Sequence, residues 1–194
     1  MLCEADWNME CDVYWPEPGA SMSPEPGLIV FCEAMNSFNQ IVTVRTFTIS
    51  YQGLSRRIYH VQQHEWPDHG PLNHPDQLLQ LNYLVKSLQK RVEDGTVHPL
   101  VVHCSAGCGR TGTFITMSVI LERVFGHSGT PYHDTDVILD IVRELRPQRM
   151  MFIQSLCQLE FLYQTFLRRL QLESEHSFDN KISGPLDSFL ARIR

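Results

Sequence analysis

Residues 102–112 read VHCSAGCGRTG, and this stretch decides both the fold and the chemistry that the chain can support. A short apolar run, Pro99–Val102, leads into it, and a helical pattern from about Arg110 to Phe125 follows. Small residues in the turn keep side chains out of the way, so successive backbone N–H groups can point inward and hold an anion. The sequence predicts an anion-binding turn between a buried strand and a helix N-terminus.

Two side chains of this turn carry its chemistry. Arg110 can grip two phosphate oxygens through its planar guanidinium group. Cys104 lies where the backbone dipoles and the helix N-terminus create a positive potential, which favours the thiolate form at neutral pH. The pattern therefore predicts a site that binds phosphate beside an activated sulfur nucleophile.

Other interpretations of the turn fit less well. A structural turn around a buried cysteine does not require so many specified residue types in a fixed order. A zinc site could use Cys104 and Cys108, but no second cluster supplies the remaining ligands at the usual spacing. A nucleotide-binding loop would end in Gly-Lys followed by Ser or Thr, and this turn does not.

Outward from the turn, β-rich runs and helical patterns predict an α/β (α+β) fold, a twisted mixed β-sheet flanked by helices. The expected strands are Leu28–Glu33, Gln40–Tyr51 and Arg57–Trp66. Helices are expected from Pro75 through Val92, from Arg110, over Val137–Leu145, and after a capping box at Ser155 and Gln158. Residues 16–27, rich in Pro, Gly and Ser, are expected to form a surface loop. The polar segment after Glu173 is expected to be loosely held.

The composition limits the function classes. The 194 residues suit one domain, and 43% hydrophobic with 20% charged residues is the balance of a soluble globular protein. A net charge of −6 argues against a nucleic-acid surface, and no apolar run approaches the roughly 20 residues of a membrane helix. The N-terminus carries no secretory signal and the six cysteines form no disulfide-scaffold pattern, so reduced thiols in the cytoplasm are expected.

With three further stretches, the turn resembles the protein tyrosine phosphatases, in a signature variant with Cys108 that is frequent in non-receptor PEST-type and fungal members. WPDHG at 66–70 is similar to the mobile loop that carries the general acid of that family. QSLCQ at 154–158, after LRPQR at 145–149, is similar to its glutamine loop, and CDVYWP at 11–16 resembles a fourth block. The resemblance implies the phosphotyrosine phosphatase fold and a catalytic domain over residues 1–172, followed by a polar tail over 173–194.

The resemblance also implies a role for each matching residue. Cys104 would form a cysteinyl-phosphate, Asp68 would protonate the leaving tyrosine oxygen, and Thr111 would donate a hydrogen bond to the sulfur. Gln154 would position the hydrolytic water with help from Gln158, and His103 would orient the loop. The implied phosphate and substrate contacts come from Ser105, Ala106, Gly107, Cys108, Gly109, Arg110, Asp68 and Gln154. The scheme requires no metal or organic cofactor.

The implied partners are phosphotyrosine-containing proteins, bound by a monomer that contacts neither nucleic acid nor membrane. Two alternatives stay open, a non-catalytic phosphotyrosine-binding module and a dual-specificity or lipid phosphatase. Because Cys11 resembles a family position behind the signature loop, oxidation could join it to Cys104.

The sequence departs from the family pattern at two places. The family domain normally begins upstream of Met1, with a loop whose tyrosine stacks on the substrate ring, so a fold incomplete at the N-terminus and weak turnover by these 194 residues are expected. Glu10 stands where the family usually has lysine, and an inward-pointing acid would weaken anion binding.

Overall fold

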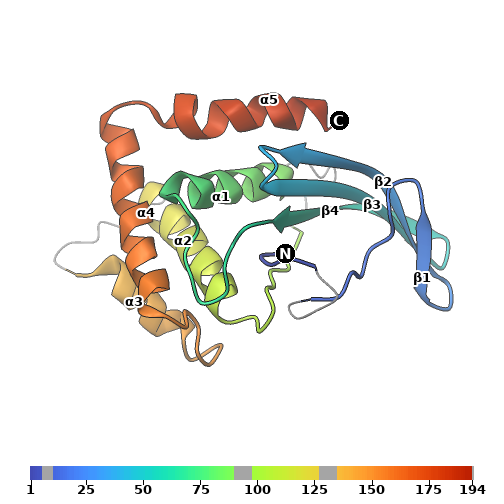
Figure 1. Ribbon diagram of the computed structural model, residues 1–194, viewed down its shortest axis with the longest axis horizontal. Coiled ribbons are helices and arrows are strands. Elements are labelled where there is room, and N and C mark those ends of the chain that lie inside the picture. The colour runs from blue at the N-terminus through green and yellow to red at the C-terminus, as the bar shows by residue number, and fades with distance from the viewer. Residues whose placement is uncertain (6–10, 90–97, 127–134, 194) are drawn as a thin grey trace.

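The computed structural model describes residues 1–5, 11–89, 98–126 and 135–193, with the sheet at one end of the molecule and the helices gathered at the other (Figure 1). Two residues named in predictions from the sequence lie outside the described residues. They are Glu10, expected to weaken anion binding, and Val92, the expected end of a helix. The elements in chain order are β1 Ser21–Glu25, β2 Leu28–Phe38, β3 Val42–Tyr51, β4 Leu54–Gln63, α1 Pro75–Gln89, α2 Gly109–Phe125, α3 Val137–Leu145, α4 Leu156–Ser174, a π-helical turn Asp179–Ser183 and α5 Gly184–Arg192.

The α+β class is confirmed, but the sheet of the described residues is antiparallel throughout, in the order β1-β2-β3-β4, and not mixed. Its strands are joined by short turns, which reverse the chain and cannot make the crossover that a parallel pair needs. The β3–β4 hairpin shows this best. Tyr51 pairs with Leu54, and Gln52 and Gly53 between them have φ of 49° and 79°, as the tightest hairpin turns require.

Two expectations about strands are wrong. Pro99–Val102 is extended but belongs to no strand of the described sheet, and Val101 is 81% exposed. Residues of β4 and Leu100–Val102 line the same cavity of about 520 Å³, and within the described sheet β4 pairs with β3 alone. Residues 16–27, expected to be a loop, contain β1, which pairs with β2 through backbone groups that a Pro- and Gly-rich composition does not reveal.

The main core lies among α1, α2, α3 and α4, on which buried side chains face one another. They include Leu78, Leu81, Met117, Ile120, Ile138, Ile141, Phe161 and Leu162. One half of the predicted capping box of α4 is present, because Ser155 Oγ accepts a hydrogen bond from Gln158 N at 3.3 Å. In the other half, Gln158 Oε1 accepts from Gln154 N, one residue before the N-cap. This core fixes the N-termini of α2 and α4. The signature turn, residues 102–112, lies at the first of them, and the glutamine segment, residues 154–158, lies at the second. No helix among the described residues has the length and apolar character to cross a membrane.

The segment after Glu173 is not the loosely held tail that its polarity predicted. It continues through the π-helical turn into α5, which lies along α1 and the β2–β3 end of the sheet (Figure 1). Leu186, Phe189 and Leu190 are buried there against Phe38, Val42, Val44, Leu84 and Leu88. Three apolar side chains spaced along one face are enough to hold an otherwise polar helix, since stability depends on the buried stripe and not on the mean composition.

We therefore expect F189A to lower the free energy of unfolding by about 3–5 kcal/mol, because the substitution leaves a cavity between α5 and Phe38. The matched control is L167A on the exposed face of α4, which should change it by less than about 0.5 kcal/mol. Urea denaturation of both variants measures the difference. Equal midpoints for F189A and L167A would show that α5 does not contribute to the stable core.

Candidate active site

The signature turn joins the extended residues 99–103 to the first turn of α2, and it encloses the Cys104 sulfur. Cys104 is 5% exposed, and the backbone amides of Gly107, Cys108 and Thr111 act to lower the pKa of its thiol. These amides belong to the stretch in which the sequence predicts inward-pointing N–H groups. An anion at this position meets several donors and the positive end of α2.

Two opposing effects set the pKa of Cys104. Burial raises the pKa of the thiol, but the Thr111 hydroxyl and the backbone amides bring it below its ordinary value. The Thr111 hydroxyl is itself buried and has no hydrogen-bond partner of good geometry among the described residues, the Cys104 sulfur included. That this hydroxyl donates to the sulfur stays a prediction of the sequence.

Arg110 is the largest side chain that is almost completely buried, at 1% exposure. Its Nη1 donates to the Trp66 carbonyl oxygen at 3.0 Å, and its Nη2 lies 3.2 Å from Asp68 Oδ1. The arginine of the turn therefore contacts the segment that carries the expected general acid. A buried guanidinium held in this way is oriented in advance for a bidentate partner.

Residues 66–70 form a compact turn over the signature turn. Trp66 is buried, and its indole Nε1 donates to Gly70 O at 3.1 Å, while Gly70 N donates to Pro67 O at 3.2 Å. Ser155 Oγ, besides capping α4, donates to His69 O at 2.7 Å. The position of Asp68 is therefore tied both to Arg110 and to the start of α4.

Gln154 and Gln158 lie against Gly109 at the start of α2. A Cβ atom added to Gly109 would stand 2.6 Å from Gln154 Oε1 and 2.8 Å from Gln158 Nε2, so any larger residue here would displace these two amide groups. Gln158 Oε1 accepts from Gln154 N at 3.0 Å. The Nε2 atom of Gln158 is buried and makes no hydrogen bond within the described part of the chain. Its N–H groups are therefore unused donors beside the turn.

The outer side of the turn uses residues whose roles were not predicted. Arg149 Nη2 donates to Ala106 O at 2.9 Å, and Ile153 N donates to Cys108 O at 3.2 Å. Ile153 has φ of 64°, which is an outlier for a β-branched residue and costs about 1–3 kcal/mol. Both residues lie in or beside the LRPQR and QSLCQ blocks. These blocks indicated which part of the chain belongs to the site, but not which atoms of the turn the two residues contact.

A chain of hydrogen bonds behind Cys104 was also missed, apart from its last member, His103. Arg45 can only donate, so the contacts assign one direction to the whole chain. Arg45 Nη1 lies 3.3 Å from His60 Nδ1, His60 Nε2 lies 3.1 Å from the Tyr14 hydroxyl, that hydroxyl lies 2.6 Å from His103 Nε2, and His103 Nδ1 lies 3.1 Å from Cys104 O. The chain thus links β3 to the carbonyl of the expected nucleophile.

The protonation states agree with this direction. Burial lowers the pKa of His60 to about 3 and also lowers the pKa of His103, so both imidazoles are neutral at pH 7. Burial raises the pKa of Tyr14 to about 12, so its hydroxyl keeps its proton. His60 lies on β4, within the strand that was expected over Arg57–Trp66, but no local pattern in the sequence distinguishes its imidazole from those of the exposed histidines.

The comparisons agree with this geometry. The family model of the protein-tyrosine phosphatases matches residues 1–168. Tyrosine-protein phosphatase 3 of Schizosaccharomyces pombe is 37% identical over 84% of this chain and 54% of its own length. Human tyrosine-protein phosphatase non-receptor type 18 is 31% identical over 86% of this chain and 35% of its own length. A solved structure of PTPN18 with HER2 phosphopeptide superposes with a TM-score of 0.76 at 28% identity, covering 86% of this chain and 60% of that one.

The chain belongs to the protein-tyrosine phosphatase family, as the match over residues 1–168 and these relatives establish. It spans about half or less of the length of the two curated relatives. The matched part of the chain includes the signature turn, the loop of residues 66–70 and the glutamine segment.

The Thr111 contact gives a prediction that does not depend on turnover. T111A should raise the pKa of Cys104, because the thiolate loses a donor, and alkylation by iodoacetamide at pH 6 should slow by about tenfold or more. T113A is the matched control, since Thr113 Oγ1 donates to Gly109 O at 3.0 Å and not to the sulfur. Alkylation of Cys104 is followed by peptide mapping across a pH series. An unchanged midpoint in T111A would remove Thr111 from the account of the thiolate.

Proposed function

We propose that this chain hydrolyses phosphotyrosine in proteins through a cysteinyl-phosphate intermediate. The observation that carries the proposal is the Cys104 sulfur, held with a lowered pKa in a turn whose arginine contacts Asp68 at 3.2 Å. Nucleophile, anion-binding donors and a proton source thus lie within one site, as phosphoryl transfer requires. Family membership supports the same reaction class.

In the first step the Cys104 thiolate attacks phosphorus, and the bond from phosphorus to the tyrosine oxygen breaks. Arg110 and the amides of residues 105–110 stabilise the equatorial oxygens. Binding of the phosphate by Arg110 replaces its ion pair with Asp68, and the released carboxylate takes up a proton from water beside the anionic substrate. The protonated Asp68 then gives this proton to the departing tyrosine oxygen. Trp66 and Pro67 hold the loop that carries this acid over the turn.

In the second step water attacks the phosphocysteine, and Cys104 leaves as a thiolate. Asp68, now ionised, accepts the proton of that water. Gln154 positions the water, and the buried Gln158 Nε2 is a donor for the same purpose. The hydrogen bond from Thr111 makes the sulfur a better leaving group, because it stabilises the thiolate that forms.

The proposed substrate class is phosphotyrosine in proteins. The related PTPN18 structure is a complex with HER2 phosphopeptide, which supports phosphotyrosine-containing proteins as partners here. The proposal places the activity in the cytoplasm, with the chain as a monomer. A phosphotyrosine peptide, a phosphothreonine peptide and a phosphoinositide, compared at equal concentration, separate this function from dual-specificity and lipid phosphatase activity. Binding of the phosphotyrosine peptide without any turnover would instead identify a binding module.

C104S should lower the turnover of a phosphotyrosine peptide by at least about 10⁴-fold, because the variant lacks the nucleophile. The peptide should still bind with a Kd within about tenfold of the parent, since the arginine and amide donors remain. C32A, at a buried cysteine of β2, is the control and should keep the parent rate. Rapid acid quench with mass spectrometry then looks for phosphate on Cys104 in the parent. Turnover near the parent rate in C104S would exclude this nucleophile.

D68A should lower kcat for a phenyl phosphate by about 10²- to 10⁴-fold, because the leaving phenolate no longer receives a proton. The loss should be much smaller for p-nitrophenyl phosphate, whose leaving group departs readily without one. D140A, at a partly exposed position of α3, should behave as the parent with both substrates. A loss of the same size for both leaving groups would contradict the role of Asp68 as the general acid.

A further inference from the structure

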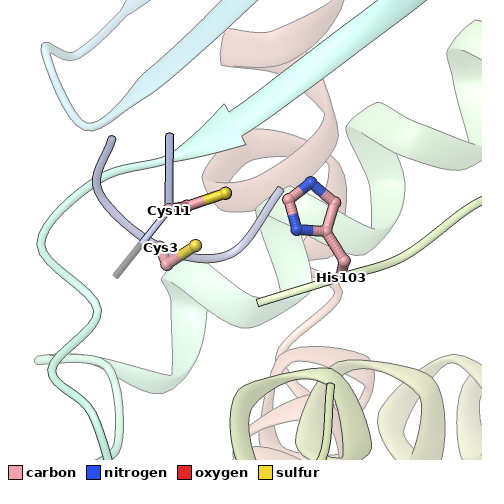
Figure 2. A group of neighbouring side chains, drawn as sticks. All are labelled: Cys3, Cys11 and His103. Atoms are coloured by element: carbon pink, nitrogen blue, oxygen red, sulfur yellow. The ribbon is translucent and has the colours of Figure 1, made fainter. Parts of the chain in front are cut away.

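Three side chains outside the proposed chemistry converge behind the signature turn. They are Cys3 and Cys11 from the N-terminal segment and His103 from the residues leading into the turn (Figure 2). One ligand atom from each, a sulfur or a ring nitrogen, lies within 4.8 Å of the other two. Cys3 is 1% exposed, while Cys11 and His103 are half-buried. None of the six cysteines forms a disulfide, so both sulfurs are available in the thiol or thiolate form.

Two thiolates and one imidazole form a ligand set that suits Zn²⁺ better than the hard cations, which prefer oxygen. With zinc–sulfur bonds of about 2.3 Å and a zinc–nitrogen bond of about 2.0 Å, tetrahedral ligand atoms stand roughly 3.5–3.8 Å apart. The three ligand atoms now lie within 4.8 Å of one another. A shortening of these separations by about 1 Å would therefore bring all three onto one ion. Three protein ligands leave the fourth position for water, the coordination that catalytic zinc sites have.

The surroundings of His103 also suit a metal ligand. A ligating histidine normally donates its second ring N–H to an oxygen. Nδ1 lies 3.1 Å from Cys104 O, and Nε2 lies 2.6 Å from the Tyr14 hydroxyl. Whichever nitrogen binds the ion, the other keeps an oxygen partner. If Nε2 binds, Tyr14 still has His60 at 3.1 Å.

We propose that Cys3, Cys11 and His103 form a Zn²⁺ site behind the signature turn. This goes beyond the proposed phosphatase reaction, which needs no metal. Because His103 directly precedes Cys104 and contacts its carbonyl oxygen, an ion held here acts on the position of Cys104 from the side opposite the phosphate. Zinc bound at this site changes the reactivity of the Cys104 thiolate without contacting its sulfur.

The test uses the full chain under a reducing phosphine, with Co²⁺ as a coloured substitute for Zn²⁺. The parent should bind one Co²⁺ with a thiolate-to-metal charge-transfer band, and Zn²⁺ should displace it. C3S and C11S should each weaken binding by about 100-fold or more, since even outer partners of metal ligands are worth about 10- to 100-fold. C104S should keep the site, because its sulfur is not a ligand. C157S, at an exposed cysteine, is the control and should bind as the parent does.

A second measurement covers a variant that fails to fold. In the parent, Zn²⁺ should protect Cys3 and Cys11 from alkylation and leave Cys157 reactive, as peptide mapping shows. Cobalt binding that disappears in C104S and persists in C3S and C11S would assign the ion to the active-site thiolate and overturn the proposal. Absence of a charge-transfer band and of zinc protection in the folded parent at millimolar metal would overturn it as well.

Discussion

The signature turn can hold an anion only when its peptide N–H groups point inward, and the carbonyl groups that point outward in consequence each need a donor. These donors come from three different parts of the chain. The pairs are His103 Nδ1 with Cys104 O, Arg149 Nη2 with Ala106 O, and the backbone N–H groups of Gly112 and Ile153 with Cys108 O. The positive φ of Ile153 is a cost of this arrangement, since it places a backbone donor where the turn requires one. The anion site is thus maintained from its outer side.

The same turn brings a buried charge into the fold, and this charge couples the acid loop to the anion site. Arg110 is nearly inaccessible to water, so its guanidinium depends on oxygen partners inside the protein. Trp66 O and Asp68 provide them, and Ser155 fixes the far side of the same loop through His69 O. The position of residues 66–70 is therefore tied to the arginine of the turn and to the start of α4.

The sequence predicted what is local and failed where partners are distant. The Cys104 to Arg110 turn, the start of α2 and the Ser155 cap follow from residue types at fixed short spacings. Strand β1 and helix α5 were missed because their stability comes from backbone pairing with β2 and from apolar contacts with α1 and the sheet, which composition does not encode. The roles expected from the resemblance await the substitutions described above.

The hydrogen-bond chain from Arg45 links the sheet to Cys104. Arg45 is buried on β3, where Gln62 on the neighbouring strand also accepts from it at 2.9 Å. Its guanidinium therefore has a fixed place, and His60, Tyr14 and His103 pass that constraint to Cys104 O one contact at a time. All three relay groups are neutral at pH 7, so none of them loses a proton that the chain needs. The sheet and the helical core, which contain the two separate apolar clusters, meet in this way at the carbonyl of the residue on which the proposed chemistry depends.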